Sequence, residues 1–240
     1  MDADLRKTIY IDQATIPQDA GLVCGHLAYT TLWRVFKQAQ LVTVLREPVS
    51  RVLSHWLYWR ASSDESLLRW GTWSRYVTLA RKPLADFLDR TDLGCQIDNL
   101  AVRMLVWPHP HISDSGFIDR RYDDTLVHEA MLRLQRFAFV DAIENPDFPI
   151  NLAQWFGKSL HYGRENPTPA ISPELSSFLH EELTPKAIDL LESHTRLDNQ
   201  LWTKVIAWRA PHFEVEKLRR RILLTTVARY SWLLSSAISR

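Results

Sequence analysis

The twenty residues 41–60, LVTVLREPVSRVLSHWLYWR, constrain the possible fold more than any other stretch of the chain. Residues 41–45 are apolar and rich in β-branched side chains, which is typical of a short buried parallel strand. After Arg46 and Glu47, apolar residues recur at helical spacing. Pro48 suits a first helical position, because it has no N–H group to leave unpaired. The stretch therefore predicts a strand, a tight turn and a helix.

The turn of this unit is a candidate anion site. Free N–H groups and the positive end of the helix dipole are expected beside Arg46, at the carboxyl end of the strand. An arginine in that position suits a phosphate or sulfate group. Farther along the helix, Ser54 can add a hydroxyl to the same anion, and its expected neighbours on the face away from the core are Arg51, His55 and Tyr58. The alternative is a surface arginine beside a helix that only packs.

Composition limits the classes of protein to consider. A chain of 240 residues with 46 % hydrophobic and 24 % charged residues suits one α/β domain with a substantial core. The net charge of +1 gives no global field for nucleic acid, so nucleic acid is not an expected partner and any anion site must be local. The two cysteines lack metal-ligand spacing, so no metal is expected. The charged start, without an apolar segment, does not indicate a signal peptide, and a cytoplasmic or membrane-peripheral location is expected.

Along the chain, short strands alternate with helical segments, which predicts an open parallel sheet covered by many helices. The strands are expected at 8–11, 21–24, 41–45 and 137–140. Helices are expected at 27–38, 67–80, 84–88, 98–105, 125–135 and 150–156, from 172, and from 184 through 202. Residues 107–124 are rich in Pro, His, Gly, Ser and Asp and are expected to form an exposed loop that lies over a site. His109 and His111 lie there without a third ligand at suitable spacing, which does not favour a metal site.

The C-terminal segment 214–240 is predicted to be a basic amphipathic helix. Arg229 interrupts its apolar part, so the helix is too short and too charged to span a bilayer. Docking onto the domain or onto a partner helix is the preferred interpretation, and contact with a membrane surface is the alternative. The expected organisation is an α/β domain over 1–210 followed by this helix at 211–240.

Several segments, in the right order, resemble the sulfotransferase family, in particular Golgi-type and bacterial carbohydrate sulfotransferases. VTVLREPVSRVLSHWLYWR resembles the family's 3′-phosphate-binding motif over about twenty positions. GLVCGHLAYTTLW is similar to the strand ending in Gly-His that supplies the catalytic base in uronyl 2-O-sulfotransferase-like members. Weaker similarities follow in DNLAVRML, RLQRFAFVDAIENPDFPINLAQWFG and LTPKAIDLLESHTRLDNQLW.

This resemblance implies a P-loop-NTPase-like three-layer sandwich, with a short parallel sheet flanked by many helices. It implies that Arg46 and Ser54 bind the 3′-phosphate of the co-substrate PAPS or its product PAP. It implies that His26 is the general base, which takes a proton from a hydroxyl of a carbohydrate or similar acceptor while the sulfuryl group is transferred.

One expected part of the family's site is missing. The family binds the 5′-phosphosulfate with a loop close to P-K-T-[AG]-[GST]-[ST], but Lys7-Thr8 is followed here by Ile9, and no glycine precedes Gly21. The first strand and phosphate loop are therefore expected to be absent, and Asp141 replaces a glycine near the expected nucleotide. Three alternatives follow: the downstream part of a longer sulfotransferase, a catalytically inactive relative that binds PAP, another anion or a partner protein, or a helical interaction protein without nucleotide binding.

Overall fold

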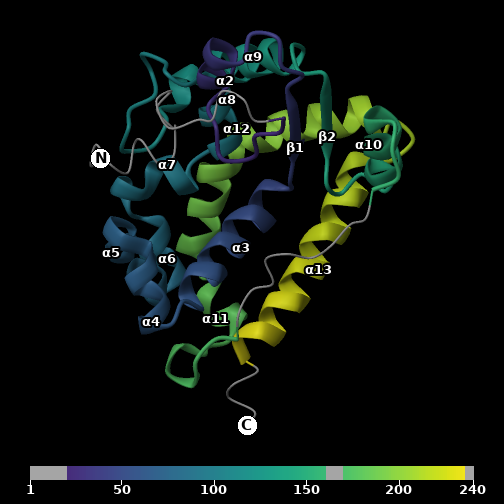
Figure 1. The fold of residues 1–240 in the computed structure, drawn as a ribbon. Coiled ribbons are helices and arrows are strands. Elements are labelled where there is room, and N and C mark those ends of the chain that lie inside the picture. Colours follow the sequence, from purple (N-terminus) through teal and green to yellow (C-terminus); the bar gives the residue numbers. More distant parts are fainter. Residues whose placement is uncertain (1–20, 161–169, 236–240) are drawn as a thin grey trace.

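Two short strands form a parallel sheet within a mostly helical chain (Figure 1). The computed structural model describes residues 21–160 and 170–235. Strand β1 (Val42–Leu45) pairs with β2 (Phe139–Ala142), so that Val42 lies opposite Phe139 and Leu45 opposite Ala142. The α/β class and the parallel pairing predicted from the sequence are confirmed at this level.

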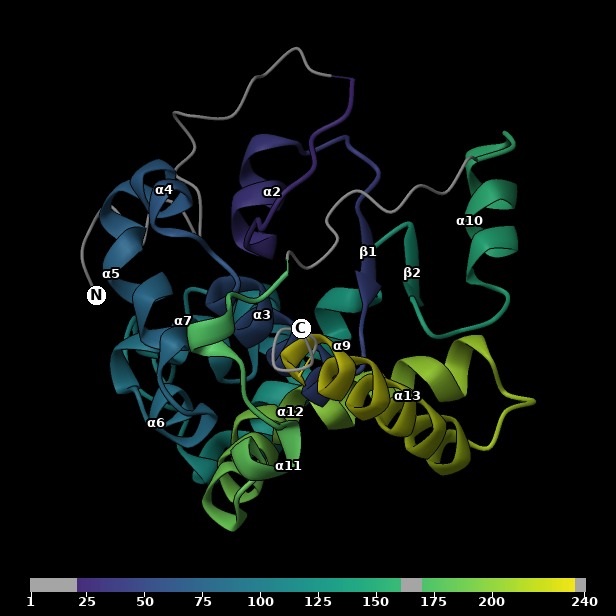
Figure 2. The same ribbon diagram turned by 90° about the horizontal axis from the view of Figure 1, so that it is seen from below.

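Helices connect and surround the two strands. In Figures 1 and 2, α2 lies on the β1 side of the sheet and α10 on the β2 side. The α-helices in chain order are α2 (Tyr29–Val35), α3 (Pro48–Arg60), α4 (Asp64–Leu67), α5 (Ser74–Val77), α6 (Leu84–Leu88), α7 (Gly94–Ile97), α8 (Leu100–Val106), α9 (Asp123–Leu134), α10 (Phe148–Phe156), α11 (Leu179–Glu182), α12 (Pro185–Arg209) and α13 (Val215–Ser235). The 3₁₀ turns are η2 (Leu68–Trp73), η3 (Thr78–Arg81), η4 (Thr91–Leu93), η5 (Arg120–Tyr122) and η6 (Pro173–Leu175).

The strand–turn–helix unit predicted at 41–60 is confirmed. Strand β1 is followed by Arg46 and Glu47, and α3 begins at Pro48, where the fixed φ of proline fits the first turn. The helix ends at Arg60, whose buried guanidinium donates to the carbonyls of Ala80 and Leu175. That contact ties the end of α3 to segments distant in sequence.

The strands differ in burial. Every residue of β2 is buried, whereas Val42 and Val44 of β1 are 39 % and 38 % exposed. Helices α10 and α12 pack against β2, while the described residues pair only one edge of β1. The expectation of a fully buried strand at 41–45 is therefore wrong for its outer positions.

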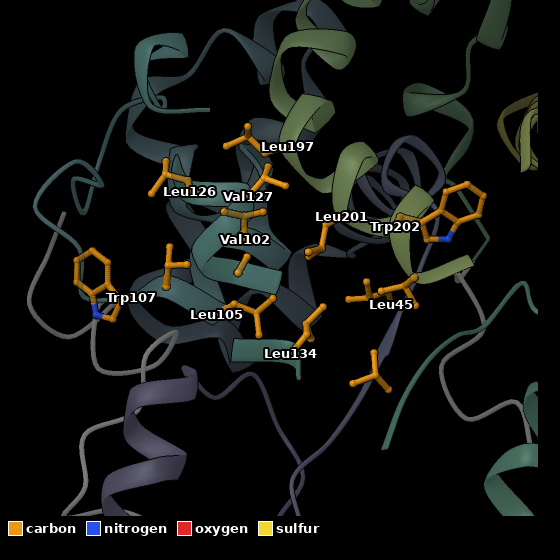
Figure 3. Close-up of a cluster of buried hydrophobic side chains, with 14 of the residues drawn as sticks. Leu45, Val102, Leu105, Trp107, Leu126, Val127, Leu134, Leu197, Leu201 and Trp202 are labelled. Atoms are coloured by element: carbon orange, nitrogen blue, oxygen red, sulfur yellow. The ribbon is translucent and has the colours of Figure 1, made fainter. Parts of the chain in front are cut away.

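The 25-residue helix α12 connects two hydrophobic cores. Its C-terminal half contributes Leu201 and Trp202 to the core under the sheet, where they meet Leu45, Val102 and other apolar side chains (Figure 3). Its N-terminal half contributes Ala187 and Leu191 to a second core built on α3, α5 and α6. A helix of this length spans about 37 Å, enough to reach both cores.

The strand expected at 21–24 is not formed. Leu22 is 71 % exposed and Cys24 is exposed, so neither side chain has the burial that the prediction required. An isolated four-residue apolar run needs a neighbouring strand to pair with, and residues 21–24 pair with neither β1 nor β2. His26 therefore follows an irregular segment. The run at 8–11 lies outside the described residues.

Most predicted helices are present, with two exceptions. The helix expected at 67–80 is broken into short pieces, because Gly71 has a φ of 54° and a ψ of −127° that no helix accommodates. The helix expected from 172 is only the turn η6. The later strand lies slightly beyond the predicted 137–140, at β2.

The C-terminal helix α13 packs against α3, α11 and α12. It buries Leu218 in the core under the sheet and Tyr230 and Leu234 in the second core. Across residues 21–160 and 170–235, no helix has the length and apolarity needed to cross a membrane. The division at residue 210 stays a prediction.

Candidate functional site

A cleft of about 590 Å³ lies where the start of α3, the turn after β2 and helix α13 meet. Arg46 and Ser54, the two residues predicted from the sequence to bind a phosphate, both line it. Its size falls in the range of small-molecule sites. The other lining residues are Ser50, Ile143, Glu144, Leu218, Arg221, Ile222, Thr225, Thr226, Arg229 and Tyr230.

Two hydrogen bonds join α13 to α3 and to Arg46, which lies just before α3. The hydroxyls of Ser50 and Thr226 are hydrogen-bonded at 2.8 Å, and Nη2 of Arg46 donates to Oη of Tyr230 at 3.2 Å. The two helices run side by side in the same direction (Figure 1). Tyr230 lies one turn beyond Thr226, as Ser54 lies one turn beyond Ser50. Arg46 and Ser54 therefore line one cleft beside α13, where both side chains are available to an anion.

The backbone N–H groups at the start of α3 are occupied by the protein's own carboxylates. Glu47 caps the helix, and its carboxylate accepts from the N–H groups of Val49 at 3.3 Å and Ser50 at 2.7 Å. The N–H of Glu47 donates to Glu144 at 2.9 Å. The expectation that free N–H groups of this turn bind the anion is therefore wrong, and an anion here depends on side chains.

The charge in the cleft is mainly positive. Burial raises the pKa of Glu144, which also accepts from the indole N–H of Trp202 at 3.1 Å. The cleft is also lined by three arginines, Arg46, Arg221 and Arg229. Because guanidinium groups stay charged at all physiological pH values, the cleft suits phosphate or sulfate esters.

The contribution of α13 was not predicted. Arg221, Thr225 and Arg229 are four residues apart, which places them on one stripe of the helix, and all three line the cleft. The spacing is visible in the sequence. The element that this stripe faces cannot be read from the sequence, because it depends on the packing of α13 against α3.

The predicted base, His26, is not among the described residues that line the cleft. Burial, together with the nearby charges of Arg51 and His26, lowers the pKa of His55 to about 3. His26 therefore lies beside the Arg51–His55 face of α3. That face is about 100° around the helix from the Ser50–Ser54 face. The catalytic role of His26 stays a prediction.

Arg51 and His55 were expected on an exposed face, and that expectation is wrong for their polar ends. Nε and Nη2 of Arg51 and Nε2 of His55 are buried and lack a hydrogen-bond partner among the described residues. Nη1 of Arg51 donates to the carbonyl of Gln96 at 3.2 Å, and burial lowers the arginine pKa. Helix α12 packs against α3, which accounts for the burial.

Two of the weaker motif segments meet in a structural junction. The carboxylate of Asp198 accepts from the N–H groups of Ala101 and Val102, so it caps α8. The side-chain oxygen of Asn99 accepts from the N–H of Leu197 at 2.8 Å. These segments, 98–105 and 184–202, therefore fix α8 to α12 and do not line the cleft.

Asp141 is held away from the cleft. Its buried carboxylate accepts from the side-chain amides of Asn145 and Asn151, and it lies 3.7 Å from Nε of Arg209. Its negative charge is therefore offset by Arg209 at the end of α12 and by two amide donors.

The loop at 107–124 is more buried than expected. Trp107, Ile112 and Ile118 are buried in the core under the sheet. Nε2 of His109 lies 3.4 Å from Glu129, and His111 stacks on a tyrosine ring. Among the residues that the structure describes, no cluster of three or more His, Cys, Asp or Glu side chains is placed to hold a metal ion.

Comparisons with known proteins assign no family to the chain. No protein-family model, no curated protein and no solved structure matches it. The resemblance to sulfotransferases therefore depends on the motif residues themselves and on where they lie.

Proposed function

We propose that the chain is a sulfotransferase-like protein that binds PAPS or PAP, with the 3′-phosphate in the cleft between α3 and α13. One observation carries the proposal. Arg46 and Ser54, the two residues of the sequence motif, line the same cleft. Charge-assisted hydrogen bonds from a guanidinium and a hydroxyl are suited to a phosphate ester.

The reaction that follows from the resemblance is sulfuryl transfer. A hydroxyl oxygen of a carbohydrate or similar acceptor attacks sulfur in line, the bond from sulfur to the phosphate oxygen breaks, and the proton passes to His26. The products are a sulfate ester and PAP. The proposal includes the P-loop-NTPase-like sandwich that the resemblance implies.

A second candidate is an inactive relative that binds the nucleotide without turnover. Two observations favour it: His26 does not line the cleft, and the carboxylate of Glu144 occupies the N–H of Glu47. A negative charge at that position opposes a second phosphate close to the turn. Nucleotide binding is common to both candidates, whereas transfer separates them.

Thermal unfolding with and without PAP tests the binding. At a PAP concentration one hundred times Kd, binding contributes about 2.7 kcal/mol. For a chain of this length the expected rise in Tm is about 5–10 °C. Arg46→Ala should abolish the rise. Arg220→Ala, on the exposed side of α13 and outside the cleft lining, should retain it.

Transfer is tested with labelled PAPS and a panel of carbohydrate and small alcohol acceptors. Label in a sulfate ester, lost in His26→Ala, is the result expected of a transferase. A Tm rise without transfer identifies the inactive relative. If PAP gives no rise, or if the rise survives Arg46→Ala, the proposed 3′-phosphate site is wrong and an interaction protein becomes the better description.

A further inference from the structure

The cleft contains more cationic groups than one phosphate requires. Arg46, Arg221 and Arg229 line it, and its only lining carboxylate among the described residues is Glu144. That carboxylate already accepts from the N–H of Glu47 and from the indole of Trp202. Glu144 interacts electrostatically with Arg46, but one carboxylate faces three arginines, so the lining keeps an excess of positive charge.

Two of these arginines form one cationic group. Arg46 donates to Oη of Tyr230, and Cζ of Arg229 lies 5.6 Å from the centre of the Tyr230 ring. The two guanidinium groups therefore both lie against Tyr230, and Ser54 lines the same cleft. Together they can surround a single phosphate.

Arg221 lies at the other end of the stripe. It precedes Arg229 by eight residues, which is about 12 Å along the helix axis. Thr225 lies between them and also lines the cleft. Arg221 is therefore a second, separate cationic group.

The pairing of cations along α13 distinguishes the cleft arginines from their neighbours. Arg219 lies 3.6 Å from the carboxylate of Glu47, and Lys217 forms an ion pair with Glu214 at 2.7 Å. Within residues 21–160 and 170–235, neither Arg221 nor Arg229 lies within ion-pair distance of a carboxylate. The cationic stripe faces the cleft without an anion.

We propose that α13 supplies a second anion subsite, so that the cleft takes a ligand with two separated phosphate groups, of the nucleoside 3′,5′-bisphosphate class. One phosphate contacts Arg46, Ser54 and Arg229, and the other contacts Arg221 beside Thr225. In this arrangement an arginine of α13 contacts the phosphate that the phosphate loop would bind in sulfotransferases, a loop that the sequence does not show. The inference rests on the proposed function and extends it to a helix outside the resemblance.

Isothermal titration calorimetry with the full chain tests the second subsite. The ligands are PAP, with two phosphates, and 3′-AMP, with one. PAP is expected to bind the wild-type protein at least tenfold more tightly than 3′-AMP, because a charge-assisted hydrogen bond contributes about 1.5–3 kcal/mol, and 1.4 kcal/mol is a factor of ten.

Single variants assign the phosphates. Arg221→Gln should weaken PAP about tenfold or more and leave 3′-AMP unchanged, whereas Arg229→Gln should weaken both ligands. Arg220→Gln is the matched control, because it removes the same charge from the same helix outside the cleft, and it should leave both affinities within twofold. Circular dichroism checks that each variant is folded.

The outcomes separate the two proposals. If the wild-type protein binds PAP and 3′-AMP equally, or if Arg221→Gln behaves like Arg220→Gln, the second subsite is wrong while the 3′-phosphate site stands. If neither nucleotide binds the wild-type protein, both proposals are wrong.

Discussion

An Arg103→Met variant should unfold at a much lower urea concentration than a variant with a matched substitution on the surface. The Arg103 side chain is fully buried, with 0 % exposure. Its Nη2 lies 2.6 Å from the carboxylate of Asp98, and the other donors contact the carbonyls of Asp98, Ser113 and Gly116 at 2.7–3.0 Å. One guanidinium thus holds α8 and the loop after it together.

The expected cost follows from what the substitution leaves behind. Methionine fills much of the volume but donates no hydrogen bond, so the carbonyls of Ser113 and Gly116 lose this donor. The buried Asp98 carboxylate loses its arginine and keeps the N–H of Ile118. Removing one partner of a buried ion pair costs about 3–5 kcal/mol. At about 2–4 °C per kcal/mol for a chain of this size, the Tm should fall by about 6–20 °C.

Urea denaturation followed by circular dichroism measures the change, with the slope m used to check that unfolding stays two-state. Arg121→Met is the control. Arg121 also donates to a carboxylate, that of Asp119 at 2.7 Å, but its side chain is 77 % exposed. An exposed pair contributes about 0–1 kcal/mol. If Arg103→Met costs no more than Arg121→Met, the assignment of Arg103 as a structural anchor is refuted.

Three further changes test other parts of the structure. Burial acts to raise the pKa of Asp98, but the neighbouring His194 and Arg103 outweigh burial and the pKa is lowered. The contribution of Asp98 to stability should therefore be present above about pH 4 and be lost as the pH falls through the folded-state pKa. Urea denaturation curves recorded from pH 7 to 3 should show this pH-dependent component in the wild type and lack it in Asp98→Asn. Arg51→Met should lower the free energy of unfolding by less than Arg103→Met, because Nε and Nη2 of Arg51 have no acceptor among the described residues, although the substitution also removes a cation near the buried Asp198. A loss as large as that of Arg103→Met would contradict this. Gly94→Ala should destabilise the protein by at least about 1–3 kcal/mol, because a Cβ at residue 94 would overlap the carbonyl oxygen of Gly116; a Tm equal to that of the wild type would show that the loop moves aside freely.

Sequence patterns predicted the parts of the fold that depend on nearby residues. The strand, turn and helix at 41–60 follow from local composition and from Pro48, and the helix from 184 follows from Thr184, whose hydroxyl caps α12. The strand at 21–24 failed, because a strand depends on a partner that a short run does not specify. Burial of the polar end of Arg51 was missed for a related reason, since helical spacing does not reveal that α12 covers this face.

Only the part of the candidate site that comes from β1 and α3 was predicted from the sequence. Arg46 and Ser54 are close in sequence and belong to one strand–helix unit, so a single motif places both in the cleft. Arg221 and Arg229 reach the same cleft from α13, and no local rule connects that helix to β1. The competing carboxylate of Glu144 comes from the turn after β2 and was missed as well.

Occupation of the α3 N-terminus by Glu47 and Glu144 has a consequence for how the cleft works. The first turn of α3 is satisfied without a ligand, so the α3 end of the cleft does not require an anion in order to fold. Binding then depends on guanidinium groups that come from both β1–α3 and α13. A ligand that contacts both elements favours the docking of α13 against β1–α3. Because linkage is reciprocal, docking of α13 increases the affinity for that ligand by the same free energy. Docking of α13 and occupancy of the cleft are therefore coupled in the proposed site, through the contact of Arg46 with Tyr230.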